Sequence, residues 1–235
     1  MKTLAVIILA VGLCVGAERF LNPGPKSASE AIGRCDEPSL RGFLDRETPA
    51  DACDSQGQPL VAIAAARGNL EAAVVLLDRG ADPNRADDRG WTALHFAVMI
   101  NNLPIVRLLV ERGAEVNRAT TLGLTPLLIA TQAGFGELIG WLLDHGADAN
   151  APWPDGDTPL HSAVRCGCAP AVQALLARGA DPLAANRAGI TPLDEARKAG
   201  NRDIITRLES AGRLGLDGLN PLVKAATVPL RRPAI

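Results

Sequence analysis

The residues of this chain that could do chemistry are few, and several stand close together. Cys166 and Cys168 flank a single glycine, and His161 precedes them. Two thiolates and an imidazole can bind a soft metal ion, and a close thiol pair can form a reducible disulfide. His161 and His95 also carry the side chain that most often acts as a general base. However, these three ligands fit no familiar zinc spacing, and the sequence holds no Ser-His-Asp order or phosphate loop.

The two histidines occupy the same position of an internal repeat with a period of 33 residues. Glycines, threonines, leucines and alanines keep this period independently of one another. Such a period predicts an array of stacked units, because one unit cannot bury its apolar face alone. The repeated positions are Gly80, Gly113, Gly146, Gly179 and Gly212; Thr92, Thr125, Thr158 and Thr191; Leu94, Leu127, Leu160 and Leu193; and Ala97, Ala130, Ala163 and Ala196.

Each unit carries the local signals of two short helices. The repeated threonines stand where a helix N-cap is expected, and proline follows three of them, where its missing N–H would be unpaired anyway. A glycine, or once Asn101, separates the paired helices, because these residues tolerate a left-handed backbone. The expected helices cover residues 59–67, 70–79, 92–100, 103–112, 125–133, 136–145, 158–166, 169–178, 191–199 and 202–211.

The repeat resembles the ankyrin repeat. The clearest copies run from Gly90 through Thr92, Leu94 and His95 to Ala97, and over residues 156–163. The resemblance implies an all-α solenoid of helix-turn-helix units with short β-hairpin loops, in which the repeated histidine hydrogen-bonds between loops. The acids at the Ala-Asp-x-Asn position, such as Asp82, would fix loops rather than form an acid–base pair. The expected units cover residues 54–86, 87–119, 120–152, 153–185 and 186–212.

The ends of the chain differ from the repeats. Residues 1–17 have the pattern of a signal peptide, which predicts cleavage before Glu18 and export to the periplasm or outside the cell. An uncleaved anchor and lipidation at Cys14 are the alternatives. We expect a flexible leader over 18–35, a capping remnant over 36–53 that includes the second helix of a unit, and a C-terminal tail over 213–235. In the tail, a short helix near 219–226 would cover the last repeat.

Four cysteines remain in the exported chain, and an even number favours disulfides. A bridge between Cys35 and Cys53 would close a loop of about 18 residues and contribute roughly 3 kcal/mol. Against it, the repeat frame places the two cysteines at opposite ends of a helix over 38–46, about 13 Å apart. A bridge between Cys166 and Cys168 would be strained, so the alternatives there are free thiols, a passive bridge, a redox pair or a soft-metal site.

Large or charged residues at variable positions of the frame mark the expected binding surface. In ankyrin arrays the partner usually lies on the concave face, which hairpin tips and first helices form. We expect an exposed apolar stripe of Trp91, Met99, Ile100, Leu122, Leu124 and Trp153, because contiguous apolar groups mark interfaces. Trp141 is expected to pack in the core. The full predicted surface is Asp88, Arg89, Trp91, Met99, Ile100, Thr121, Leu122, Leu124, Gln132, Trp153, Asp155, Asp157 and Arg165.

These observations favour a non-enzymatic protein that binds one or more protein partners. The net charge of −2 argues against nucleic-acid binding, which needs a basic face. We expect no cofactor, no metal, no membrane span in the mature chain and a monomer. Exported proteins with this resemblance include helpers of enzymes and immunity proteins that inhibit a toxin. The alternative is a redox or soft-metal protein that uses Cys166 and Cys168.

Overall fold

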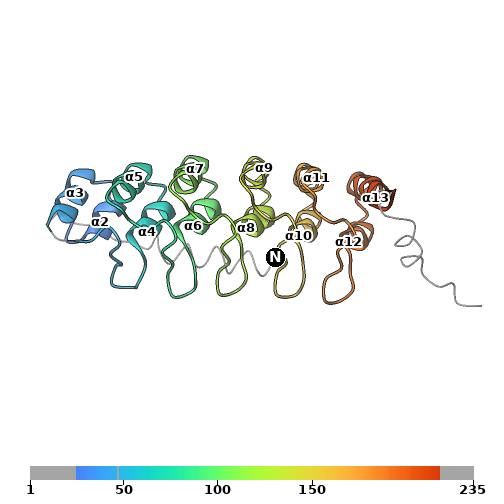
Figure 1. The fold of residues 1–235 in the computed structure, drawn as a ribbon, viewed down its shortest axis with the longest axis horizontal. Coiled ribbons are helices and arrows are strands. Elements are labelled where there is room, and N and C mark those ends of the chain that lie inside the picture. Colours follow the sequence, from blue (N-terminus) through green and yellow to red (C-terminus); the bar gives the residue numbers. More distant parts are fainter. Residues whose placement is uncertain (1–24, 47, 218–235) are drawn as a thin grey trace, which may run out of the picture.

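The chain forms one elongated array of paired helices (Figure 1). The computed structural model describes residues 25–46 and 48–217. An inner row holds α2, α4, α6, α8, α10 and α12, and an outer row holds α3, α5, α7, α9, α11 and α13. The helices are α2 (Ala28–Gly33), α3 (Glu37–Asp45), α4 (Leu60–Ala66), α5 (Leu70–Asp78), α6 (Ala93–Met99), α7 (Leu103–Glu111), α8 (Pro126–Ala133), α9 (Gly136–Asp144), α10 (Pro159–Arg165), α11 (Ala169–Ala177), α12 (Pro192–Ala199) and α13 (Arg202–Asp217).

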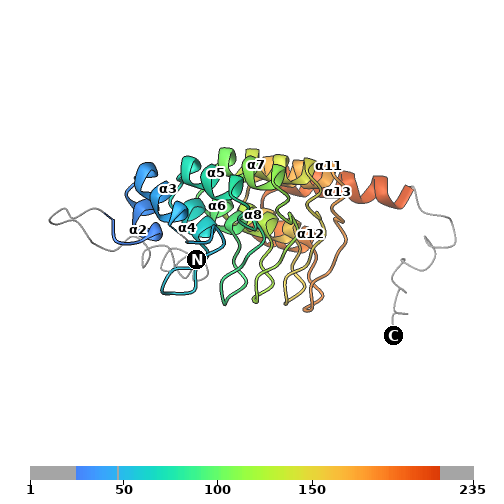
Figure 2. The same ribbon diagram turned by 60° about the vertical axis from the view of Figure 1, so that its left-hand side comes forward.

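The loops that connect successive units all project from the same side of the array (Figure 2). Two isolated antiparallel bridges, Cys53 with Pro59 and Ala86 with Thr92, are the only β-pairing in the described ranges. The all-α repeat solenoid predicted from the sequence is therefore confirmed. Within the same ranges, no helix combines the length and apolar character needed to cross a bilayer.

The predicted local signals act where the sequence places them. Thr92, Thr125, Thr158 and Thr191 are the N-cap residues of α6, α8, α10 and α12. Asn101 adopts the left-handed backbone, with φ of 54°, between α6 and α7. Short helices separated by such turns fold back on each other, so each unit becomes an antiparallel helix pair.

The core lies between the units and consists mainly of alanine and leucine. The alanines Ala97, Ala130, Ala163 and Ala196 are completely buried on the inner helices, which pack against one another along the row. Small side chains at this position let neighbouring helices approach closely. Leucines between the two rows then fill the space, and truncating such a buried leucine to alanine typically costs about 2–5 kcal/mol.

The expected flexible leader is wrong for its second half, because α2 lies there. Ser27 caps this helix by accepting a hydrogen bond from the N–H of Glu30, and Ala31 and Ile32 are buried against the array. Asn69 Nδ2 donates to the carbonyl of Ile32 at 3.1 Å, which ties α2 to the first repeat. The segment 36–53 therefore contributes the second helix of a complete N-terminal pair.

The other end of the array is also modified. Helix α13 continues to Asp217, so Gly212 lies inside a helix instead of ending one. Leu183 stands where earlier units have asparagine, and a Cβ on Gly212 would lie 3.8 Å from its Cδ2. The inter-unit hydrogen bonds of the asparagines therefore stop here. The signal peptide, the site at Glu18 and the short helix near 219–226 lie outside the described residues and remain predictions.

Candidate protein-binding surface

Regular hydrogen bonds fix the spacing of the loops that border the inner row. Asn117 Nδ2 donates to the carbonyl of Gly146 at 2.8 Å, and its Oδ1 accepts from the N–H of Asp148 at 2.8 Å. Asn84 and Asn150 make the same two bonds in their own units. This ladder explains the repeated Ala-Asp-x-Asn motif, and it holds successive loops at one separation.

Neighbouring hairpin tips also bond directly to each other. The N–H of Thr121 donates to the carbonyl of Arg89 at 3.0 Å, and the N–H of Arg187 donates to that of Asp155 at 3.0 Å. A Cβ on Gly90 or Gly156 would lie 2.9 Å or 2.8 Å from the nitrogen of the following tip. Glycine is needed at these tips because the backbones approach so closely. These bonds link the tips in two pairs, one in the second and third units and one in the fourth and fifth units.

The repeated histidine has the structural role that the resemblance implied. His95 is fully buried, and its Nδ1 accepts from the N–H of Thr92 at 3.1 Å. Its Nε2 lies 3.1 Å from the carbonyl of Leu124 and must donate, because a carbonyl can only accept. Burial lowers the pKa of His95 to about 4. The ring is therefore neutral, and both nitrogens are committed to bonds that join two loops.

The predicted apolar stripe is only partly exposed. Leu122 is 67 % exposed at the tip of its hairpin, as expected. Leu124 is 4 % exposed, so its placement at the surface was wrong: this residue closes the hairpin and packs inward. Trp91, Met99 and Trp153 are half-buried against the core.

The two surface tryptophans contact the array instead of projecting from it. The Trp91 ring lies 5.3 Å from that of Phe96 and 5.7 Å from that of His95. Trp153 lies against the preceding hairpin, where its Cδ1 would be 3.7 Å from a Cβ on Gly123. Trp141, predicted to pack in the core, is partly buried against it and stacks on His145 with ring centroids 3.7 Å apart.

The predicted polar positions also divide into exposed and buried residues. Asp88, Arg89, Thr121 and Asp155 are exposed, and Ile100 and Gln132 are half-buried. Asp157 is 3 % exposed, so its assignment to the free surface was wrong. The reason is a hydrogen bond from Asn186 Nδ2 of the next hairpin at 2.8 Å, which covers the carboxylate.

Asp157 belongs to a charge cluster on the inner face. Arg165, whose side chain is 44 % exposed, binds Asp157 and also lies 3.2 Å from Glu195 Oε1. Although burial opposes ionisation, hydrogen bonds from Asn186 and Arg165 lower the pKa of Asp157. Arg165 therefore bridges two carboxylates from successive units.

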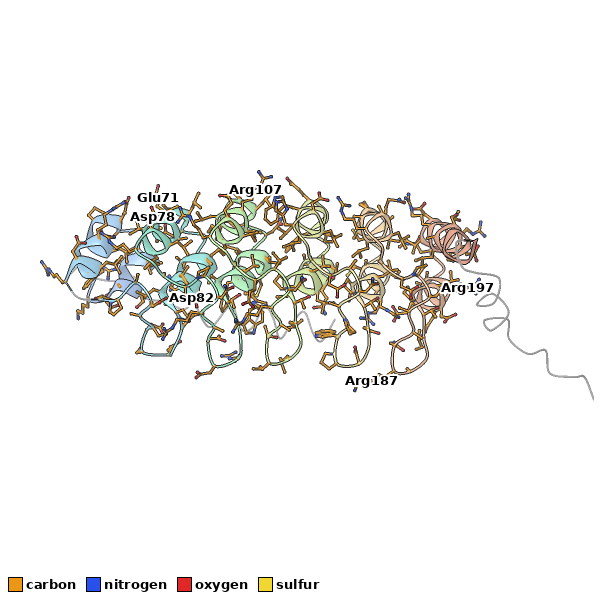
Figure 3. The ribbon with its side chains drawn as sticks, viewed as in Figure 1. Glu71, Asp78, Asp82, Arg107, Arg187 and Arg197 are labelled. Carbon is orange, nitrogen blue, oxygen red and sulfur yellow. The ribbon has the colours of Figure 1, made fainter. Side chains whose placement is uncertain are left out.

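Sequence reasoning missed Ile190, Arg187 and Glu195 as residues of this surface. Ile190 is 40 % exposed in the last hairpin, and Figure 3 shows Arg187 at the end of that loop. The frame could have found Ile190 and Arg187, because they occupy the positions of the predicted surface residues Trp91 and Thr121 in other units. Glu195 lies on the inner helix, one period after Ser162.

The predicted disulfides are not formed, because Cys35, Cys53, Cys166 and Cys168 are free thiols. Helix α3 separates Cys35 from Cys53, which is the geometric obstacle that the frame indicated. Cys166 Sγ donates to the carbonyl of Gln132 at 3.2 Å, and burial raises the pKa of this thiol. A raised pKa disfavours the thiolate that nucleophilic or metal-binding chemistry needs.

Among the described residues, no three His, Cys, Asp or Glu side chains gather as a metal site would require.

Comparison with known families finds two matches. A model described as "Ankyrin repeats (many copies)" matches residues 61–110, and one described as "Ankyrin repeats (3 copies)" matches residues 117–186. Comparison with the curated proteins finds none that matches this chain. Together the two models cover just over half of the sequence and coincide with the helix pairs of the array. The chain therefore belongs to the ankyrin-repeat family.

Proposed function

We propose that this protein is a non-enzymatic binding module that is exported to the periplasm and engages a protein partner through its hairpin tips and inner helices. Ankyrin repeats generally mediate protein–protein interaction, which supports the general role. The signal-peptide pattern of residues 1–17 supports export. The partner would be an enzyme that the protein assists or a toxin that it inhibits.

The observation that carries the proposal is the exposure of Leu122. Among the large apolar residues of 25–46 and 48–212, where side-chain exposure is described, it is the most exposed, at 67 %. Thr121 precedes it, and the Thr121 hydroxyl donates to the carbonyl of the exposed Arg89 on the neighbouring tip at 2.9 Å. Met99 and Ile100 lie half-buried at the C-terminal end of α6 in the preceding unit. An apolar anchor with a polar rim is the usual anatomy of a protein interface. The thiol chemistry of Cys166 is not part of this proposal, because its raised pKa disfavours it.

The test compares two exposed leucines. Leu122→Ser changes the proposed surface, whereas Leu70→Ser changes a 40 % exposed leucine on outer helix α5. A partner isolated from periplasmic extract should bind the Leu70→Ser variant with unchanged affinity. It should bind Leu122→Ser about 30-fold more weakly, as expected for an anchor worth about 2 kcal/mol. Equal binding by both variants would show that Leu122 is not part of the interface.

The export proposal has its own measurement. Mass analysis of protein recovered from the periplasm should give a chain that begins at Glu18. A chain that begins at Met1, or one that carries lipid on Cys14, would contradict the proposed processing. Neither result would bear on the binding proposal.

A further inference from the structure

One column of the inner helices changes character along the array. In each unit the residue after the repeated histidine position lies on the inner helix. It is apolar in the first three units and polar in the last two. The column consists of Ile63, Phe96, Ile129, Ser162 and Glu195.

The two polar members of the column have atoms that no protein group satisfies. Ser162 is 2 % exposed, and its Oγ lacks a hydrogen-bond partner in the described part of the chain. The same is true of Glu195 Oε2, which is also buried. Ser162 and Glu195 lie one period apart on α10 and α12, which pack directly against each other. An unpaired hydroxyl and an unpaired carboxylate oxygen therefore stand on adjacent helices.

The charges around these atoms do not balance. Arg165 lies between Asp157 and Glu195, so one guanidinium faces two carboxylates, with a formal sum of −1. Of the other cations on α12, Arg197 pairs with Glu209 at 2.9 Å, and the exposed Lys198 forms no ion pair with a described carboxylate. The amide of Asn186 already donates to Asp157. One negative charge at Glu195 is thus left without a full partner.

We propose, building on the binding role above, that the surface between α10 and α12 is a binding site for a cationic side chain of the bound protein. This side chain would be a lysine or an arginine. Because Glu195 Oε2 and Ser162 Oγ are buried, this cation would first displace the Arg165 side chain from Glu195 and would then donate to Glu195 Oε2 and reach Ser162 Oγ. Arg165 Nη1 lies 3.2 Å from Glu195 Oε1, and the arginine side chain is 44 % exposed, so it can rotate away from Glu195. A partner carboxylate would instead meet the net negative charge. In a partly buried site such charge-assisted bonds are strong and specific.

The test uses two small probes that need no protein partner, ethylguanidinium and n-butylammonium, at constant ionic strength. Each is titrated into the full chain, and amide and side-chain NMR shifts are recorded. At least one probe should give saturable shifts at Ser162, Arg165 and Glu195. Glu195→Gln should weaken that binding about tenfold or more, because it removes the charge of the acceptor. Glu71→Gln, an exposed carboxylate on α5, should leave it unchanged (Figure 3).

Several results would overturn the proposal. One is the absence of saturable shifts with both probes, and another is equal binding by wild type and Glu195→Gln. Probe binding that appears only after Lys198→Gln would show that the chain's own lysine occupies the proposed site. A negative result with the probes does not affect the partner measurements with Leu122→Ser. The cation site and the general binding role are therefore tested separately.

Discussion

Acidification is expected to weaken the fold at one buried side chain, His95. In the folded protein its pKa is about 4, whereas the ordinary value is 6.5. The folded state therefore binds fewer protons than the unfolded state between these two values. The stability that neutral His95 contributes is fully present above pH 6.5. It is lost as the pH falls toward 4, because the unfolded chain gains the proton and the folded chain does not.

The size of the effect follows from the two pKa values. Between pH 7 and pH 5 the loss amounts to about 2 kcal/mol, a large share of the stability of an ordinary domain. The bonds of His95 give this number its physical basis. The N–H of Thr92 points at Nδ1 at 3.1 Å, so a proton on that nitrogen would face another donor. Protonation would therefore break a capping bond as well as place a charge in the core.

The assay is urea unfolding at a series of pH values, followed by tryptophan fluorescence and circular dichroism. Trp91 lies 5.7 Å from the His95 ring and serves as a nearby reporter. The comparison variant is His95→Gln, whose amide can accept and donate hydrogen bonds but does not titrate in this range. Wild type should lose about 2 kcal/mol more than His95→Gln between pH 7 and pH 5. Parallel pH profiles for the two proteins would refute the reasoning.

Three further substitutions test the loops and the outer row. Asn117→Ala removes both ladder bonds to the next unit and should cost about 1–2 kcal/mol by urea unfolding, whereas no loss would show that the ladder is dispensable. Gly90→Ala adds a Cβ 2.9 Å from the nitrogen of Thr121 at a φ of 77°, and it should destabilise more than Gly113→Ala, which has a φ of 89° but open space. Equal losses of melting temperature would mean that backbone strain alone matters. Arg112→Gln breaks an exposed ion pair between outer helices and should change stability by less than about 1 kcal/mol.

Much of the fold could be predicted because it depends on local signals that the repeat copies several times. Threonine caps, the left-handed turn at Asn101 and the alanine column each act within one unit or between identical neighbours. Helix α2 was missed because it does not carry these repeated signals. It is six residues long and lacks the threonine and histidine of the motif, so nothing in its sequence repeats. Its burial depends on Ile32 and on the contact with Asn69, which only the packed array reveals.

The surface could be predicted less well, because the exposure of a residue depends on what the next unit places over it. The position before the capping threonine shows this directly. Leu124 and Asp157 are 4 % and 3 % exposed, yet Ile190, at the same position of the last hairpin, is 40 % exposed. Asn186 of the following hairpin covers Asp157, whereas the described array has no further hairpin to cover Ile190. A repeat frame therefore gives the direction of a side chain, but the neighbouring side chains decide whether it remains free for a partner.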